Sequence, residues 1–552
     1  MTDENTQVPR LRLRFPLNPW AIGAVVIAIV VLAPVLSILW IAFHPTENIW
    51  PHLMATVLPR YLTTTVILMA SVAILTAAVG TGAAWLVTMY RFPGQRWLTH
   101  ALLFPLAIPA YVGAYALVDF LDYAGPLQSM LRATFGWASS RDYWFPQTRS
   151  VWAASVVLSA AFYPYVYLLA RAAFREQSGC TYEVARSLGV GPWGLFLRVG
   201  LPMARPAIAA GVALALMETV ADYGTVYHFG VQTLTTGIFS TWLNGGNAGG
   251  AAQIAGVILM LILLLVLIER LGRRNARFHG LNRTARPLVP QTLDPLRGWL
   301  AFVACAVPFA IGFVLPVAVM LARSLQAPAG WLSPGLGDAL LNTLIVAGGA
   351  SVATVGAALF LVYAVRMAGR RVARVVLPVT LLGYAAPGAV LALGLLVPLA
   401  ALDHRLADGI EALTGHDPGL LITGTAFALG LAYLVRFFGI AQGALDAAFG
   451  RVSPSLPMAA RSLGRSAGGA LGSVYLPLMR GSVATALLVV FVDCVKELPA
   501  TLLLRPFNYN TLSTRVFELA SLERLSEAAP AALVVMAVGL LAVAMLARAN
   551  RS

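Results

Sequence analysis

Charged residues are scarce in this chain. Aspartate, glutamate, lysine and arginine together make up 11% of its 552 residues, whereas 59% are hydrophobic. Soluble globular domains carry about 25% charged and about 45–50% apolar residues, so the composition excludes an ordinary soluble protein and predicts an integral membrane protein. The net charge of +15 would suit nucleic acid, but the arginines stand in short clusters between apolar runs and form no continuous basic face. We therefore expect a lipid bilayer around the chain and no nucleic acid partner.

Lysine and cysteine are rarer still. The single lysine, Lys496, is followed by Glu497 in an apolar stretch, so the chain lacks the Lys-Ser/Thr pair of a glycine-rich P-loop. Cys180, Cys305 and Cys494 are far apart in the sequence, so they support neither a disulfide framework nor a thiolate metal site, and small packing roles are expected. No His, Cys or carboxylate cluster has the spacing of a hydrolytic site. The sequence therefore predicts no enzyme activity, no catalytic residue and no cofactor bound by this chain.

Long apolar runs account for most of the remaining sequence. A helix needs about 20 mostly apolar residues to cross a hydrocarbon core of roughly 30 Å, and about twelve runs satisfy this rule. The runs cover residues 20–43, 60–89, 98–121, 151–172, 204–228 and 249–269 in the first half, and 298–322, 339–365, 375–401, 420–441, 479–502 and 527–548 in the second. The predicted fold class is all-α, a polytopic membrane protein with about twelve transmembrane helices.

The loops between these runs predict the orientation. One alternating set is rich in arginine, whereas the other is poor in it, and residues 229–250 carry no charge at all. Because basic loops are retained in the cytoplasm, we expect both termini to be cytoplasmic, and the arginines of the N-terminal tail to precede a retained first helix. The predicted divisions are a cytoplasmic tail at 1–19, a first half at 20–270, a basic cytoplasmic linker at 271–297, a second half at 298–548 and a cytoplasmic end at 549–552.

A repeated stretch organises both halves. The pentapeptide Ala-Arg-Ser-Leu-Gly stands at 185–189 and again at 460–464, and a proline follows thirteen positions after each glycine, at Pro202 and Pro477. Ser-Val-Ala at 71–73 likewise recurs at 351–353, and Thr-Leu-Thr-Thr at 233–236 corresponds to Thr-Leu-Ser-Thr at 511–514. Because each half has an even number of spans, the halves share one orientation and form parallel repeats.

Each copy of the repeated stretch suits a short helix on the cytoplasmic surface. In the first copy Val184 and Leu188 fall on one face, Glu183 projects from another, and Gly189 can end the helix. The Leu-Pro pairs are expected at the start of the fifth span of each half, where proline is tolerated. A single copy could simply be an amphipathic helix lying on the membrane. Two copies with matched spacing favour a contact surface for a two-fold symmetric soluble partner.

The stretches 183–202 and 458–477 resemble the EAA loop of ABC-importer permeases, whose pattern is Glu-Ala-Ala, three residues, Gly, nine residues, a β-branched residue, any residue and Leu-Pro. The matching residues are Glu183, Ala185, Gly189, Val199, Leu201 and Pro202 in the first copy, and Ala459, Ala460, Gly464, Val474, Leu476 and Pro477 in the second. Met458 replaces the acidic residue, so a salt bridge made by Glu183 would have no counterpart. The resemblance implies a type I-like importer fold of two six-helix repeats, in which each loop forms a coupling helix that docks onto an ATP-hydrolysing subunit.

ATP must then be bound by other chains, since this one has no P-loop. The resemblance implies two copies of a cytoplasmic ABC ATPase subunit as partners, which would use ATP and Mg²⁺, and a location in the bacterial inner membrane.

Ionisable residues also recur in the fifth spans. Glu218 and Asp222 are four positions apart, and Asp493 and Glu497 repeat that spacing 275 positions later, with Lys496 between them. The spacing predicts that each acidic pair shares one helix face. Ionisable groups are costly in a membrane and usually face the bundle interior or a water-filled path, so these five residues are candidates for a translocation path or gate. Internal pairing of Lys496 with either second-half acid, and direct coordination of a hard cation by the four acids, stay open as alternatives.

These spans, together with the runs at 230–237 and 497–508, resemble the ferric-iron importer permeases of bacteria, and the similarity extends over essentially the whole chain. It implies import of ferric iron presented by a periplasmic iron-binding protein, which would lie against outer loops such as 122–150 with Trp137, Tyr143 and Trp144. Fused thiamine permeases have a similar layout, and polyamine and phosphonate importers are further alternatives. A secondary transporter that uses the four acids as an ion relay, or a channel, would be a different class.

The histidines carry little information. His228, next to the outer end of the fifth span, could touch substrate or make a hydrogen bond at the membrane interface, whereas His44, His100 and His279 show no metal-ligand spacing.

Overall fold

The computed structural model describes residues 19–274, 289–381, 383 and 386–549. The N-terminal tail, most of the basic linker with His279, and residues 550–552 lie outside this part. The first half contains α1 (Pro19–Phe43), α2 (Trp50–Ala55), α3 (Leu58–Met89), β1 (Tyr90–Arg91), α4 (Gln95–Ala101), η1 (Phe104–Ala107), α5 (Ala110–Leu121), α6 (Pro126–Phe135), α7 (Val151–Glu176), α8 (Gly179–Ser187), α9 (Pro192–Gly194), η2 (Leu195–Gly200), α10 (Leu201–Ala221), α11 (Gly224–His228), α12 (Leu234–Phe239), η3 (Ser240–Asn244) and α13 (Ala248–Arg274).

The second half repeats the main helices of the first in the same order. It contains β2 (Gln291–Thr292), α14 (Pro295–Phe309), η4 (Ala310–Val314), α15 (Leu315–Gln326), η5 (Pro328–Leu332), α16 (Leu336–Ala368), α17 (Arg370–Thr380), α19 (Gly388–Thr414), α20 (Ala426–Arg451), α21 (Ser455–Ser462), α22 (Ala467–Ala470), η6 (Leu471–Tyr475), α23 (Leu476–Lys496), α24 (Pro499–Leu504), α25 (Leu512–Ser521) and α26 (Leu525–Ala549).

The number of membrane spans agrees with the prediction. Within the described residues, 11 helices are long and apolar enough to cross a membrane, or up to 12 if a bent pair counts as one span. That pair joins Gln95–Ala107 to Ala110–Phe135 with a bend of 97°, so the run predicted at 98–121 is broken rather than straight. The all-α polytopic fold is confirmed.

Hydrogen bonds repeat along with the sequence. The same type of capping box opens α12 and α25. The first residue of each of these helices donates its N–H to a buried threonine of the long second span: Leu234 to Thr65 at 3.0 Å, and Leu512 to Thr343 at 2.8 Å. Both halves therefore hold the segment after the fifth span by the same contact, as expected of a structural duplication.

The first span of each half packs against the opposite half. Helix α1 contacts α16, α17 and α19, whereas α14 lies against α3 and α4, and α15 against α5. Glycines permit the close approach: a Cβ added to Gly394 of α19 would lie 2.2 Å from the carbonyl oxygen of Pro34 in α1, and one added to Gly312 of η4 would lie 2.5 Å from that of Ala160 in α7. The parallel pairing of β1 with β2 also holds the end of the linker beside the first half. The two halves are thus interlocked, which the repeat pattern did not predict.

Turns of π-helix stand before three Leu-Pro pairs. Segments η2, η6 and η4 end directly before the pairs that contain Pro202, Pro477 and Pro316. Proline lacks an N–H and its ring clashes with the carbonyl four residues earlier, and a wider turn accommodates both effects. The helices Pro192–Ala221 and Ala467–Lys496 continue through this junction. The prolines of the repeated stretch, expected at a helix start, therefore lie inside a longer helix.

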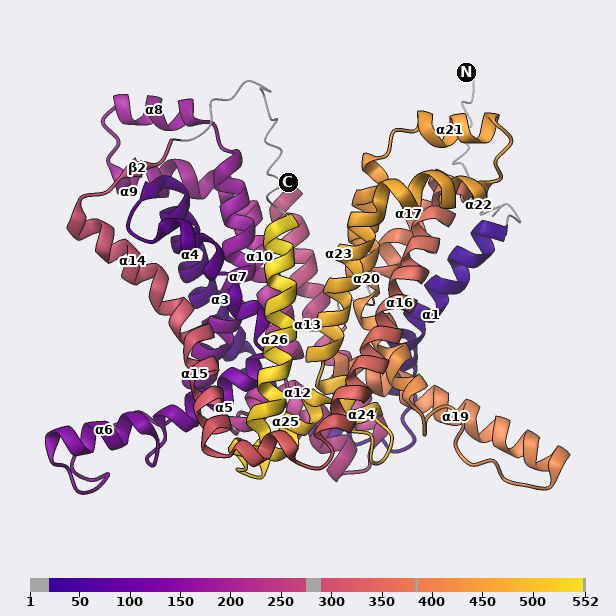
Figure 1. The fold of residues 1–552 in the computed structure, drawn as a ribbon. Helices are drawn as coiled ribbons and strands as arrows, with labels where there is room; N and C mark the ends of the chain where they lie inside the picture. The colour runs from indigo at the N-terminus through magenta and orange to yellow at the C-terminus, as the bar shows by residue number, and fades with distance from the viewer. Residues whose placement is uncertain (1–18, 275–288, 382, 384–385, 550–552) are drawn as a thin grey trace, which may run out of the picture.

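Figure 1 shows α8 and α21 at one end of the molecule, together with the start of α1 and the end of α26. The opposite end holds α6, α12, α24, α25 and the far part of α19. The helices next to α8 and those next to α21 lie farther apart than the helices at the opposite end of the central bundle. The two repeated loops thus share one side, as the arginine distribution predicts. Which side of the membrane this is stays a prediction.

Candidate functional site

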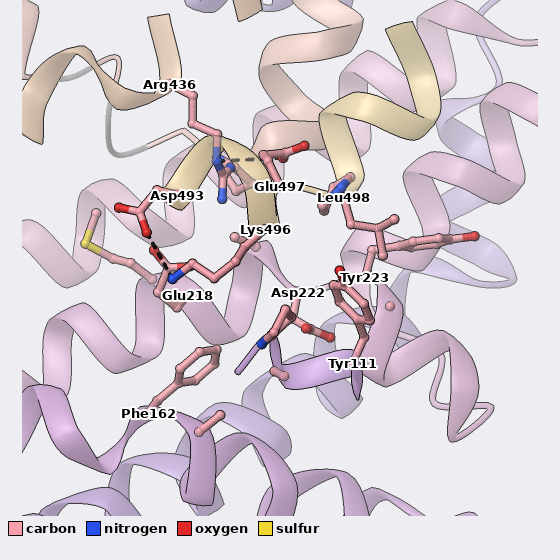
Figure 2. A pocket seen from close by; sticks show the side chains of 18 of the residues that line it. Tyr111, Phe162, Glu218, Asp222, Tyr223, Arg436, Asp493, Lys496, Glu497 and Leu498 are labelled. Carbon is pink, nitrogen blue, oxygen red and sulfur yellow. Dashed lines mark ion pairs between the residues drawn. The ribbon is translucent and has the colours of Figure 1, made fainter. Parts of the chain in front are cut away.

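A cavity of about 160 Å³ lies between the two halves, where the fifth spans meet. Its wall is formed by α5, α7 and α10 of the first half and by α20, α23 and α24 of the second, and all five ionisable candidates of the fifth spans line it. Figure 2 shows Glu218, Asp493 and Lys496 on one side of this space and Asp222 beside Tyr111 on the other. The volume is enough for several water molecules.

The fifth spans end earlier than the sequence suggested. Helix α10 ends just before Asp222 and α23 just before Glu497, where the backbone is extended, with ψ of 134° and 125°. A glycine in the first half and a proline in the second follow two residues later, and both favour a break in the helix. The prediction that Glu218 and Asp222, and likewise Asp493 and Glu497, share one helix face was therefore wrong. The second acid of each pair lies beyond the helix end.

These two acids cap the next helix in the same way. Asp222 accepts hydrogen bonds from two backbone N–H groups of α11 and from the Thr225 hydroxyl, at 2.9 to 3.1 Å. Glu497 accepts from two backbone N–H groups of α24 and from the Thr501 hydroxyl, at 3.0 to 3.1 Å. A carboxylate is favourable at a helix start because it satisfies free N–H groups and faces the positive end of the helix dipole. Both acids therefore hold the segment that follows the fifth span.

The other two acids differ in their partners. Asp493 pairs with Lys496, whose Nζ lies 3.1 Å from Asp493 Oδ1 and donates to the Leu106 carbonyl at 3.2 Å. Among the four acids, Glu218 alone has no hydrogen bond or ion pair to the described residues. Internal pairing, left open by the sequence, thus accounts for Asp493 and Lys496 but leaves Glu218 available to solvent or cargo in the cavity.

Arg436 is a cavity residue that the sequence reasoning missed. It lies on α20, with Nε 3.8 Å from Glu497 Oε1, and the two side chains are 13% and 1% exposed. The signal was present, because an arginine inside the apolar run at 433–438 is costly in a membrane and marks a functional or paired position. At the positions 275 residues before Arg436 and Lys496, the first half has Ala161 and Ala221, which also line the cavity. The acids are therefore two-fold symmetric, whereas both cations come from the second half.

The charge of the cavity follows from this count. Four carboxylates face two cations, so negative charge is in excess when all six groups are ionised. Among the described residues no group of three or more His, Cys, Asp or Glu side chains is placed to hold a metal ion. Direct coordination of a cation by these acids stays a prediction.

The helices of the two repeated loops, α8 and α21, end in the same way, at a glycine. Gly189 follows α8 with a φ of +80°, and Gly464 follows α21 with a φ of +83°. The N–H of the next residue donates to the carbonyl of Ala185 at 3.1 Å in the first loop and of Ala460 at 3.0 Å in the second. Glycine enters this left-handed conformation without a Cβ penalty, and the hydrogen bond closes the last turn. The predicted helix end at Gly189 is confirmed.

The first loop is anchored to the fifth span. Tyr182 of α8 is 2% exposed and hydrogen-bonds to Gln177, whose side-chain amide donates to the Gly200 carbonyl at 3.2 Å. Burial raises the pKa of the Tyr182 phenol, so this group stays neutral. Trp85 of α3 lies against η2, where a Cβ added to Gly200 would be 2.4 Å from its ring. These contacts therefore connect α8 to η2 and, through η2, to α10.

The second loop uses other residues at the matching positions. Tyr363 and Tyr475 stand where the first half has Trp85 and Gly200, and their ring centroids are 5.7 Å apart. The Tyr363 hydroxyl donates to the Ala467 carbonyl at 2.6 Å. No residue of α21 is buried, so this helix has no buried anchor equivalent to Tyr182 of α8.

Exposed apolar side chains cover both loop helices. Val184 and Leu188 are 58% and 77% exposed on the first, and Met458 and Leu463 are 61% and 84% exposed on the second. Glu183 is also exposed, and its equivalent is Met458. The two surfaces match in position but differ in charge.

The opposite end carries the predicted outer loop. Trp137 stacks between Phe135 and Tyr143, with ring centroids 4.8 and 4.7 Å apart, and Trp144 is 86% exposed. His228 packs edge-on against Tyr115 at 4.6 Å.

The remaining cysteines and histidines take structural positions. Cys305 and Cys494 are buried and free, whereas Cys180 is exposed at the start of α8, so a packing role holds for the first two only. His44 stacks on Trp40 at 4.1 Å.

A bundle of interlocked membrane helices with a charged cavity between parallel repeats, and with paired loops at one end, defines a transport permease. Residues 77–277, which include the first loop and the first pair of cavity acids, match the family described as binding-protein-dependent transport system inner membrane component. This stretch therefore matches an inner-membrane permease domain, and the chain has the long apolar helices of a multi-pass membrane protein.

Curated relatives agree with this family. The chain is 27% identical over 481 residues to the Fe(3+)-transport system permease protein FbpB 2 of Haemophilus influenzae, covering 86% of this chain and 87% of the relative. It is 31% identical over 156 residues to a probable sulfate transport system permease protein cysT of Nephroselmis olivacea, covering 28% of this chain and 51% of that protein. It is 27% identical over 177 residues to the molybdenum transport system permease protein ModB of Escherichia coli K12, covering 31% of this chain and 74% of that protein.

Proposed function

We propose that this chain is the permease of an ATP-driven importer that moves ferric iron, delivered by a periplasmic iron-binding protein, across the bacterial inner membrane. The observation that carries the proposal is the cavity between the halves, in which four carboxylates face two cations. The iron permease of Haemophilus influenzae supports it, because the similarity covers most of both chains.

The charge of the cavity separates the candidate substrates. Excess carboxylate attracts a cation and repels an anion such as sulfate or a phosphonate. Thiamine and polyamines are cationic and are not separated from iron by charge. Ferric iron is a hard cation that takes oxygen ligands, and the relative that matches along nearly the whole chain is named for Fe(3+) transport.

Glu218 is the residue that we assign to cargo contact. The other three acids are engaged, two as helix caps and one with Lys496. A single free carboxylate can attract the ion without enclosing it, which suits a path from which the ion must leave.

Two copies of a cytoplasmic ATPase subunit supply the energy. They bind ATP and Mg²⁺, which this chain lacks the residues to hold, and they grip α8 and α21. Closure of the ATPase pair moves α8, and the link from Gln177 to Gly200 passes that motion to α10, which carries Glu218. The loops and both termini then face the cytoplasm.

The test is ATP hydrolysis and uptake by the permease reconstituted with its ATPase and its periplasmic partner. Ferric-loaded binding protein should stimulate hydrolysis, whereas thiamine-loaded or polyamine-loaded protein should not. Replacing Glu218 with Gln should slow iron uptake at least about tenfold while the protein stays folded, because the cavity then loses the acid that has no partner among the described residues. Glu411→Gln is the matched control, since that residue is exposed at the far end of α19. Unchanged uptake in the Glu218 variant would remove it from the path.

Two other classes give different results in the same vesicles. Uptake driven by an ion gradient without ATP or companion subunits would identify a secondary transporter. Downhill flux without the binding protein would identify a channel.

A further inference from the structure

The two halves differ in length at one loop of the outer end. Asp222 and Glu497 are 275 positions apart, whereas the threonines that open α12 and α25 are 278 positions apart. The second half therefore has three more residues than the first between the capping acid and this threonine, of which one lengthens α24 and two lengthen the loop after it. This loop, at 505–510, follows the cavity wall directly.

Phe507 stands at the tip of this longer loop without any packing. Its relative exposure is 103%, so its ring contacts nothing in the described chain. Burial of this ring by a partner would remove its apolar surface from water and so contribute favourably to binding.

The loop is held in shape by polar contacts on both sides of the tip. Arg505 hydrogen-bonds to Asn510 and Glu518, and Asn510 donates to Glu518 at 3.2 Å. The Asn342 amide of α16 donates to the Asn510 carbonyl at 3.1 Å. The loop is therefore a constrained turn, and the exposure of its phenylalanine does not come from an unrestrained segment.

The turn itself directs the tip outward. The Tyr509 N–H donates to the Pro506 carbonyl at 3.1 Å, and Asn508 lies between them with a φ of +60°, a conformation that asparagine tolerates better than most residues. Phe507 is thus carried by a closed turn.

Loop 505–510 follows directly after a helix, α24, that is packed inside the bundle. Helix α24 packs against α19 and α20, and Pro499, Ala500, Thr501 and Leu504 are buried. Its first turn is capped by Glu497 in the cavity, and six helical residues span only about 9 Å. Figure 1 places α24 and α25 at the end opposite α8 and α21. The loop therefore joins the cavity wall to the end of the molecule opposite α8 and α21.

We propose that loop 505–510 is a docking element for the periplasmic binding protein, with Phe507 inserting into an apolar socket on that protein. This inference rests on the proposed function, since it needs a binding protein as partner. Arg505 is neutralised by Glu518, so the tip offers apolar contact without competing charge. Because α24 begins at Glu497, the docked partner pushes on the segment that shapes the cavity.

The experiment compares Phe507→Ala with Leu413→Ala in permease–ATPase complexes held in lipid nanodiscs. Leu413 is 88% exposed at the far end of α19, so it is a matched apolar control. Affinity for the ferric-loaded binding protein should fall at least about tenfold in the Phe507 variant, as for a central aromatic contact. The control should bind as the unaltered protein does, and hydrolysis without binding protein should not change in either variant. Affinity within twofold of the unaltered protein in Phe507→Ala would overturn the docking role.

A second measurement covers the alternative that the ring lies in lipid. In a Cys180→Ser background, where Cys305 and Cys494 are buried, Phe507→Cys can carry a fluorescent label. A change in its emission when binding protein is added supports docking. Quenching by brominated lipid in the absence of that protein overturns it. If the unaltered complex is not stimulated by ferric-loaded binding protein at all, the proposed function fails first, and the two failures are thereby distinguished.

Discussion

Three of the four cavity acids should differ sharply in how much they contribute to the free energy of unfolding. We predict that Glu497→Gln destabilises the permease strongly, whereas Glu218→Gln and Asp222→Asn have small effects. Glu497 faces Arg436 and caps α24, so the change leaves a buried guanidinium without its counter-charge. The other two substitutions leave no buried cation unpaired.

The magnitudes follow from these contacts. Breaking a buried ion pair by removing one partner costs about 3–5 kcal/mol. Asparagine caps a helix about as well as aspartate, so Asp222→Asn should cost less than about 1 kcal/mol. Glu218→Gln removes no partner and should fall within about 1 kcal/mol of the parent, since most large effects need a named lost contact. Adding Arg436→Met to Glu497→Gln should recover most of the loss, because apolar residues can replace a buried ion pair at little cost.

The assay is equilibrium unfolding in mixed detergent micelles, with the free energy of unfolding compared across the three single variants and the double variant. Uptake is measured on the same preparations, so that Glu218→Gln can be shown to lose transport while it keeps stability. Equal free energies of unfolding for Glu497→Gln and Glu218→Gln would refute the assignment of one acid to structure and the other to cargo. Failure of Arg436→Met to recover stability would show that the capping bonds, and not the ion pair, dominate.

The remaining predictions concern the repeated loops. Gly189→Ala and Gly464→Ala should each weaken co-purification with the ATPase, because a non-glycine residue at a φ near +80° costs about 1–2 kcal/mol. Gly191→Ala is the control, since Gly191 has an ordinary φ and lies in open space. Retention of the ATPase by both Gly189→Ala and Gly464→Ala would contradict a docking role for these helix ends. Glu183→Ala should reduce coupled ATP hydrolysis more than Met458→Ala, since only the first loop carries a charge there. Equal losses in hydrolysis would show that the charge difference has no consequence.

The sequence predicted the spans, the duplication and the end of the first loop helix because each depends on local chemistry. Apolar runs of sufficient length must cross the bilayer, and the glycine of each Ala-Arg-Ser-Leu-Gly copy supplies the one conformation that closes its helix. The acids of the fifth span were found for a similar reason, since any ionisable group in an apolar run stands out. Arg436 was detectable by the same rule and was overlooked only because its span contains no repeated acid.

Other features depend on contacts between distant segments and leave no local pattern. Nothing near Asp222 shows that its carboxylate turns back to cap α11, because a spacing of four residues fits a continuous helix equally well. The packing of α1 on the second half likewise rests on surfaces such as Gly394 against Pro34, which lie 360 positions apart in the sequence. A single sequence does not reveal such pairs.

The crossed packing of the first spans also sets the order in which the protein can be assembled. Helix α1 ends at residue 43, and α16, one of its contacts in the other half, begins at residue 336, so 292 residues must be synthesised in between. At a translation rate of about 5–20 residues per second, that interval lasts between roughly 15 and 60 s. During this time the surface of α1 that later packs against α16 has no partner helix from the second half. Production of both halves as one polypeptide limits that wait to the time of a single translation event and guarantees one copy of each partner.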